Sequence, residues 1–211
     1  MTEVIRHVID RASLPTDFPT HCHAADFWES LGRTVATFAL LEDVLCKAIF
    51  AFTATRPYSD TEINEAYEQW LPKLQRALSD QLRGLIDTYG KAVREHPSAT
   101  TTNLTELLDD MIAASKIRNV LCHGSWRIPD QNGASVPFFV SKQNELFETP
   151  ISKVWLEQTR QHIVTLICAV INTVTHMGWQ FPGSAGPGVP LWNSRKAQPP
   201  VASDAHKTAR A

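Results

Sequence analysis

The stretch HAADFWESLGRTVATFALLEDVLCKAIFAFT, residues 23–53, decides the expected fold. Large apolar side chains recur in it at steps of three and four residues: Phe27, Leu31, Val35, Phe38, Leu41, Leu45, Ile49 and Phe52. This spacing places them on one side of a long α-helix, and such a side must be covered by other helices. The stretch therefore predicts a mostly α protein.

Two further helical regions follow this first one. The second is predicted over about residues 59–95, because Ser59 and Glu62 form a capping box at its start. Pro72 lies inside it and predicts a kink or a break. A third helix, with a polar cap at Thr102 or Asn103, is expected to end near the glycine at position 124.

A change of pattern separates the third helix from the last one. Residues 126–148 contain short β-prone runs around the turn signal Asn132-Gly133, which predicts a small β-hairpin. Thr149 followed by Pro150 then has the form of a cap and a first-turn proline, so the fourth long helix is expected to start there. It should continue to about Met177.

The chain is expected to form one domain of up-down, four-helix-bundle-like architecture. Its predicted limits are residues 23–178, after an N-terminal segment of residues 1–22. Residues 179–211 are rich in Pro, Gly, Ser and Ala, a composition typical of a flexible tail.

Composition limits the possible functions. The 211 residues are 43% hydrophobic and 20% charged, with a formal net charge of −2, so no global basic field favours nucleic acid. The N-terminus lacks the pattern of a signal peptide, and the apolar run at residues 163–174 is too short to span a bilayer. We therefore expect a cytoplasmic protein without membrane association.

The cysteines give no sign of a cofactor. Four cysteines are present, at Cys22, Cys46, Cys122 and Cys168, and none forms a C-x-x-C pair. This argues against a disulfide framework and against a zinc ribbon. The HCH triplet at residues 21–23 is a candidate metal cluster, but a polar loop before the first helix is the favoured interpretation. No metal and no cofactor are expected.

The end of the third predicted helix, SKIRNVLCHGSW, carries polar residues on its core-facing side. With Arg118 set at zero on a helical wheel, Asn119 and His123 fall at about 100° and 140°. Met111, two turns earlier, falls at about 20° on the same side. Because an unpaired guanidinium is costly to bury, Arg118 needs an acid, an anion or water facing it. We predict that Arg118, Asn119 and His123 line one groove.

Glu42 on the first helix is the candidate acid for Arg118. It lies about 40° from Phe38, within the apolar stripe of its own helix. Two opposite charges on core-facing sides predict either an ion pair that fixes packing or the polar floor of a cleft. The sequence leaves both interpretations open.

The segment RNVLCH resembles the R-x4-H signature of the HEPN superfamily (higher eukaryotes and prokaryotes nucleotide-binding domains), and the helical context over residues 23–178 agrees with it. The resemblance implies metal-independent RNA cleavage by a homodimer, with the motif paired across the dimer. It further implies that His123 is the general acid or base, that Arg118 holds the scissile phosphate, and that Asn119 orients His123 or binds the phosphate. The catalytic role of Glu42 rests on the wheel alone.

The chemistry of RNA cleavage suits these residue types. Histidine titrates near neutral pH, and arginine offers a fixed, bidentate positive charge for a phosphate. Lys116 and Arg127 are the nearby candidates for binding RNA. A defence or toxin role, with a protein antitoxin or regulator as partner, is one form that the resemblance implies. Ser125 replaces the tyrosine of one toxin branch, so control by modification of that tyrosine is not expected.

Two other functions compete with the endoribonuclease. One is a non-catalytic HEPN-like module for dimerisation or for binding RNA or protein, in which Arg118 and Glu42 only fix the fold. The other is a metal-dependent hydrolase that uses His21, His23 and His123, although few acids are available to it.

Overall fold

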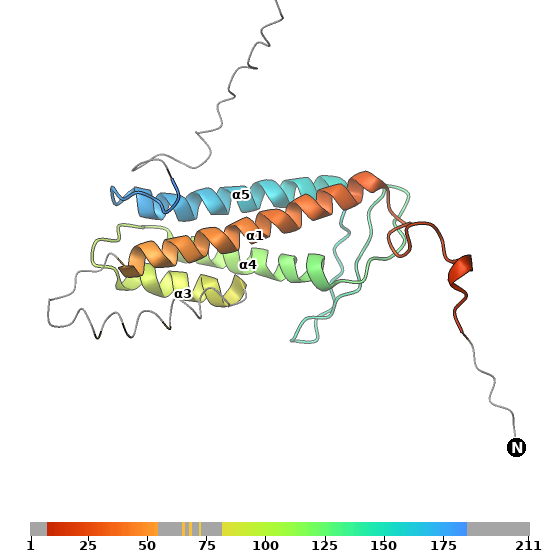
Figure 1. The fold of residues 1–211 in the computed structure, drawn as a ribbon, viewed down its shortest axis with the longest axis horizontal. Helices are drawn as coiled ribbons and strands as arrows, with labels where there is room; N and C mark the ends of the chain where they lie inside the picture. The colour runs from red at the N-terminus through yellow and green to blue at the C-terminus, as the bar shows by residue number, and fades with distance from the viewer. Residues whose placement is uncertain (1–7, 55–64, 66–67, 69–71, 73–81, 185–211) are drawn as a thin grey trace, which may run out of the picture.

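The computed structural model describes residues 8–54, 65, 68, 72 and 82–184 of the chain. These residues form a 3-10 turn and four α-helices, without a strand: η1 (Arg11–Ser13), α1 (Ala25–Ala54), α3 (Leu82–Glu95), α4 (Leu104–His123) and α5 (Lys153–Thr175). The predicted mostly α class is therefore confirmed (Figure 1). No helix of this described part is long and apolar enough to cross a membrane.

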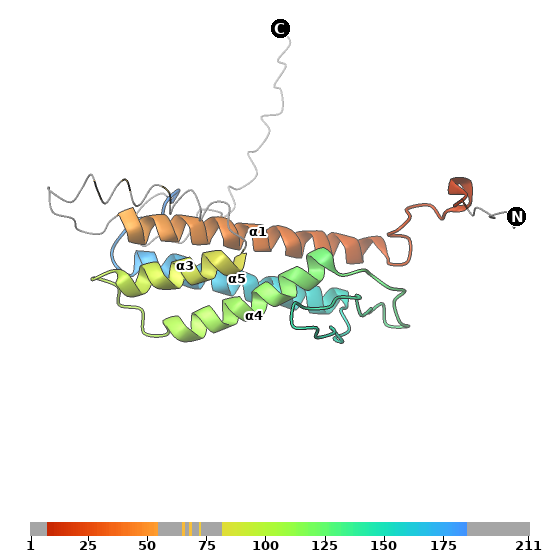
Figure 2. The ribbon, with the colours of Figure 1, turned by 90° about the horizontal axis from the view of Figure 1, so that it is seen from below.

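Helices α1 and α5 form the long pair of the fold and lie side by side in both views (Figures 1 and 2). The predicted apolar stripe of α1 is buried, including Phe38, Leu41 and Leu45. Thr34, also buried, donates from its hydroxyl to the carbonyl oxygens of Ser30 at 2.8 Å and of Leu156 at 3.2 Å. The side chain of Thr34 thus links the two helices inside the core.

The direction of this pair differs from the prediction. Lys153 at the start of α5 forms an ion pair of 3.1 Å with Asp26 at the start of α1. The two helices are therefore parallel, whereas a simple up-down order of four helices would make the first and the fourth antiparallel. The up-down order is wrong for this pair because α3 runs in the same direction as α1, with His96 after α3 against Phe52 near the end of α1. Helix α4 then brings the chain back to the start of α1, where Trp126 meets Phe27, and α5 begins at that same end.

Helices α3 and α4 complete the arrangement, and each packs against the other (Figure 2). Tyr89 of α3 shares a buried hydrogen bond of 2.9 Å with Thr173 of α5. Burial raises the pKa of Tyr89 to about 12, against the opposing effect of this hydrogen bond. Gly90 allows close packing on α4, because a Cβ there would lie 2.8 Å from Cδ1 of Leu108. All four helices therefore contribute buried side chains to one core.

The connecting segment, residues 124–152, contains turns and isolated bridges instead of the predicted hairpin. Its antiparallel bridges pair Ser125 with Phe138, Ser135 with Ile151, and Val140 with Leu146. The predicted turn is present, since Gly133 has a φ of 75° and its N–H donates to the carbonyl oxygen of Asp130 at 3.0 Å. No strand forms in this described segment, since each of these bridges stands alone instead of extending into a ladder.

The start of α5 is later than predicted. Ser152 caps the helix, and its hydroxyl accepts from the N–H of Trp155 at 3.2 Å. Thr149-Pro150 is not the cap, because Ile151 is still extended and is bridged to Ser135 through two backbone hydrogen bonds. The end near Met177 is confirmed, with Thr175 as the last helical residue.

The limits of the domain also shift at the C-terminal side. Phe181 is fully buried in the core, and the ring of Trp179 contacts His96 edge-on at 4.8 Å. The predicted tail boundary at residue 179 is therefore too early. The cap at Ser59 and Glu62, the chain on both sides of Pro72 and the tail at residues 185–211 lie outside the described residues.

Candidate functional site

The polar residues of the motif lie on the last turns of α4, as predicted from the helical pattern. Arg118, Asn119, Cys122 and His123 share this end of the helix, and we call them the motif strip. Arg118 is partly exposed, whereas Asn119, Cys122 and His123 are exposed. The predicted core-facing side is therefore not buried over the last two turns of α4. The buried residues there are Val120 and Leu121, on another side of the helix.

Arg118 and Glu42 form the predicted ion pair between α4 and α1. One guanidinium nitrogen of Arg118 lies 3.6 Å from a carboxylate oxygen of Glu42, and both side chains are 28% exposed. The pair is therefore neither sealed in the core nor fully solvated. Water still reaches both charges, and an ion pair of this kind contributes about 0–1 kcal/mol to stability.

Asn119 and His123 lie one helical turn apart on the open side of α4. Neither side chain makes a hydrogen bond or an ion pair with any described residue. Lys116, one turn before Asn119, is exposed on the same side. Polar groups that a ligand can reach are thus spaced along one helix surface, at steps of three and four residues.

The two best-defined hollows of the described part lie away from the predicted groove. One hollow lies between the starts of α1 and α5, and the other lies beside the start of α1. Neither is lined by Arg118, Asn119 or His123. The grooved arrangement of Arg118, Asn119 and His123 therefore stays a prediction.

A close backbone contact fixes the end of the motif helix. Gly124 donates its N–H to the carbonyl oxygen of Val120 at 2.8 Å. A Cβ at position 124 would lie 2.6 Å from that oxygen and 2.9 Å from Cβ of Pro137. Ser125 then exchanges two backbone hydrogen bonds with Phe138. The glycine after His123 is therefore needed so that the connecting segment can cross the end of α4.

Arg127, the second candidate for RNA binding, lies on the connecting segment. Its guanidinium carbon is 5.2 Å from the centre of the Phe138 ring, a cation–π arrangement that leaves the charge exposed. The structure thus places Arg127 after the motif helix and not on it.

The histidines at positions 21 and 23 do not join His123 in a cluster. His23 is buried, and its Nε2 lies 3.1 Å from both the carbonyl oxygen of Arg127 and the hydroxyl of Ser135. His21 contacts Cys22 at 3.4 Å. Within the described part of the chain, no group of three His, Cys, Asp or Glu side chains could hold a metal ion.

Comparisons with known proteins add no assignment. No family model matches this chain, and no curated protein or solved structure matches it either.

An aromatic cluster next to the motif was missed by the sequence analysis. Trp126, three residues after His123, meets the rings of Phe27 at 5.1 Å, of His23 at 6.1 Å and of Trp28 at 6.1 Å, all edge-on. The pattern H-x3-F-W at the start of the first helix was a possible signal. It could not reveal the cluster, because Trp126 is about a hundred residues away and joins it only in the folded chain.

Proposed function

We propose that this chain is a metal-independent endoribonuclease of the kind that the HEPN resemblance implies, acting as a homodimer. The motif strip carries the proposal: it presents an exposed histidine and an exposed amide one turn apart, beside an arginine placed by Glu42. These are the groups that in-line attack on a phosphodiester requires.

Each residue of the strip has a distinct proposed role. His123 removes the proton from the attacking ribose 2′-OH or gives a proton to the leaving 5′-oxygen. Arg118 binds the phosphate, where negative charge accumulates as the new P–O bond forms and the old one breaks. Asn119 orients His123 or binds the phosphate. Glu42 restricts the positions that the Arg118 side chain can adopt.

The proposed homodimer answers a chemical requirement. One proton has to be removed and another supplied, while each chain carries one histidine in its motif strip. Two strips facing each other would supply two histidines and two arginines, and would enclose the predicted groove. Lys116 and Arg127 would then contact the RNA backbone on either side.

RNA cleavage in excess chelator tests the proposal. The purified chain should cleave RNA and leave cyclic phosphate ends, and His123→Ala should lower the rate by about 10²–10⁴-fold because proton transfer is lost. Arg118→Ala should lower it to a similar degree, whereas Arg118→Lys should retain part of the activity since a positive charge remains.

His162→Ala is the matched control, because His162 is an exposed histidine on α5 that lies outside the motif strip. It should leave the rate unchanged. Absence of cleavage by the folded parent chain on structured and unstructured RNA would overturn the proposal, and activity that the chelator abolishes would favour a metal-dependent hydrolase.

The partly exposed Arg118–Glu42 pair favours one alternative, a non-catalytic module that dimerises or binds RNA or protein. In that case Glu42 would neutralise the arginine and hold the helices together. RNA binding without cleavage, equal in the parent chain and in His123→Ala, is the result that this alternative predicts.

A further inference from the structure

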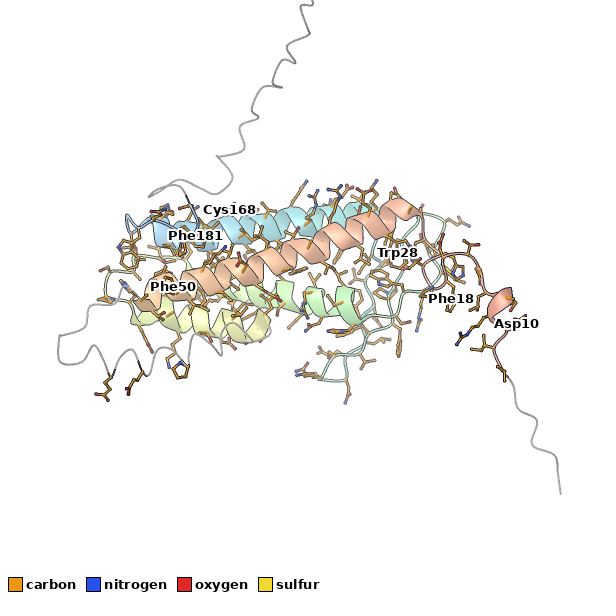
Figure 3. The ribbon with its side chains drawn as sticks, in the orientation of Figure 1. Asp10, Phe18, Trp28, Phe50, Cys168 and Phe181 are labelled. Carbon is orange, nitrogen blue, oxygen red and sulfur yellow. The ribbon has the colours of Figure 1, made fainter. Side chains whose placement is uncertain are left out.

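A second site lies where the chain enters α1, at the end of the molecule marked by Phe18 and Trp28 in Figure 3. A hollow of about 460 Å³ opens there between the first turn of α1 and the segment before it. It is lined mainly by Thr16, Asp17, Thr20, His21, His23 and Trp28. None of these residues belongs to the motif strip, so the hollow needs a separate explanation.

Two aromatic rings form a corner of this hollow. The rings of His23 and Trp28 lie 5.5 Å apart with an angle of 77° between their planes. The indole N–H of Trp28 donates to the carbonyl oxygen of Thr20 at 2.7 Å, and the ring of His23 stacks on Phe27 at 4.1 Å. Both rings are therefore held in place before any ligand arrives.

The charge of the lining is negative. Asp17 contributes a carboxylate, and no lysine or arginine lines the hollow. The carboxylate of Asp17 makes no hydrogen bond or ion pair with any described residue, while its carbonyl oxygen accepts two hydrogen bonds from Thr20. Burial lowers the pKa of His23, opposed by the hydrogen bond to Arg127, so this ring is mostly neutral at neutral pH.

We propose that this hollow binds an organic cation, with a quaternary ammonium or a guanidinium group as its head. The indole face of Trp28 attracts cations. The ring of His23 is 9% exposed and stacks on Phe27, so its part is to hold Trp28 in place through their edge-on contact. The carboxylate of Asp17 complements the charge, and it repels phosphate-bearing ligands. The amino end of α1 favours an anion, but Asp26 in its first turn offsets that effect.

Choline and its neutral isostere, in which carbon replaces the nitrogen, are the probes that test this site on the full chain. The observed signal is the indole N–H resonance of Trp28, identified as the resonance that Trp28→Phe lacks. Choline should shift it with an affinity in the millimolar range, and the isostere should shift it much less because shape alone is retained.

Asp17→Asn removes the charge without straining the backbone, since asparagine also tolerates the φ of 62° found at Asp17. It should weaken choline binding by about 3- to 10-fold through loss of the Coulomb attraction. Asp109→Asn, which removes an exposed carboxylate on α4, is the matched control and should bind choline like the parent.

Three results would overturn the proposal. Equal shifts of the Trp28 resonance by choline and by the isostere would show that the hollow binds apolar groups without regard to charge. A stronger shift by adenosine would show that it binds a nucleobase. The absence of a shift with every probe would leave no ligand site there. All three can be read from the parent chain, and none depends on RNA cleavage.

Discussion

His23 joins the start of α1 to the connecting segment through a single side chain. Its ring lies in the aromatic cluster at the start of α1, while its Nε2 approaches Arg127 and Ser135 of the connecting segment. The segment that follows the motif helix is thus attached to the start of α1. A change in the charge of this ring should therefore change the free energy of unfolding of the whole domain.

The stability should rise with pH in the window below about 6.5, the pKa of His23 in an unfolded chain. Burial lowers the pKa of His23 in the folded chain, so the unfolded chain binds more protons within this window. The stabilisation is complete above the unfolded pKa and is lost as the pH falls towards the folded pKa. Denaturant unfolding at a series of pH values measures this dependence.

His23→Gln should flatten that pH dependence, because glutamine keeps hydrogen-bonding groups without a titrating ring. His162→Gln changes an exposed histidine and should retain the slope of the parent. An identical slope in His23→Gln and in the parent would show that other groups cause the effect.

The contact between Arg118 and Glu42 could be predicted from sequence, because each charge interrupts an apolar stripe of known period. The exposure of the pair could not be predicted. Which side of the last turns of α4 faces the neighbouring helices depends on how the helices pack, and Val120 and Leu121 are the residues buried there. The same limit applies to His123, which the wheel placed towards a groove and the structure shows exposed.

At the scale of elements, the crossing of α4 by the connecting segment depends on Gly124. Gly124→Ala should lower the free energy of unfolding by about 1–3 kcal/mol, because its Cβ would press on the Val120 carbonyl and on Pro137. Gly32→Ala is the contrasting variant on α1, where no atom lies within 4 Å of the added Cβ. It should raise the free energy of unfolding by about 0.5–1 kcal/mol, the helix-propensity difference.

Denaturant unfolding of both variants checks the sign as well as the size of the two effects. If Gly124→Ala were as stable as the parent, the segment that crosses the helix end would have to be able to move away without cost.

Element boundaries show where local signals are sufficient and where they fail. The limits of α1 follow from its apolar period, which continues without interruption. Thr149-Pro150 is a good local start signal for α5, yet the bridge between Ser135 and Ile151 keeps the chain extended beyond it. The hairpin prediction was only partly right: the local turn signal at Asn132-Gly133 does form a turn, but no ladder of backbone hydrogen bonds extends from it.

For the whole molecule, Phe181 closes the core from beyond the last helix. Its ring is fully buried, so Phe181→Ala should cost about 3–5 kcal/mol through lost burial and the cavity that remains. Phe50→Ala removes a ring that is 41% exposed and should cost about 1 kcal/mol or less. Figure 3 shows both positions on the described chain.

Thermal or denaturant unfolding of the two variants measures the difference. If both variants lost the same free energy of unfolding, Phe181 would not belong to the core. The domain would then end before residue 179, as the composition predicts.

The parallel pairing of α1 and α5 also determines how the chain must fold. Thr34 and Leu156 are in contact although they are 122 residues apart in sequence. Helical proteins fold fast when their contacts are local, and closing a long loop adds an entropic barrier. Helices α3 and α4 are neighbours in sequence and can pack early in folding. Helices α1 and α5 can pack only when the two ends of the domain have come together. Folding should therefore be slower than is usual for a helical protein of this size, and on a ribosome it should finish only after α5 has emerged.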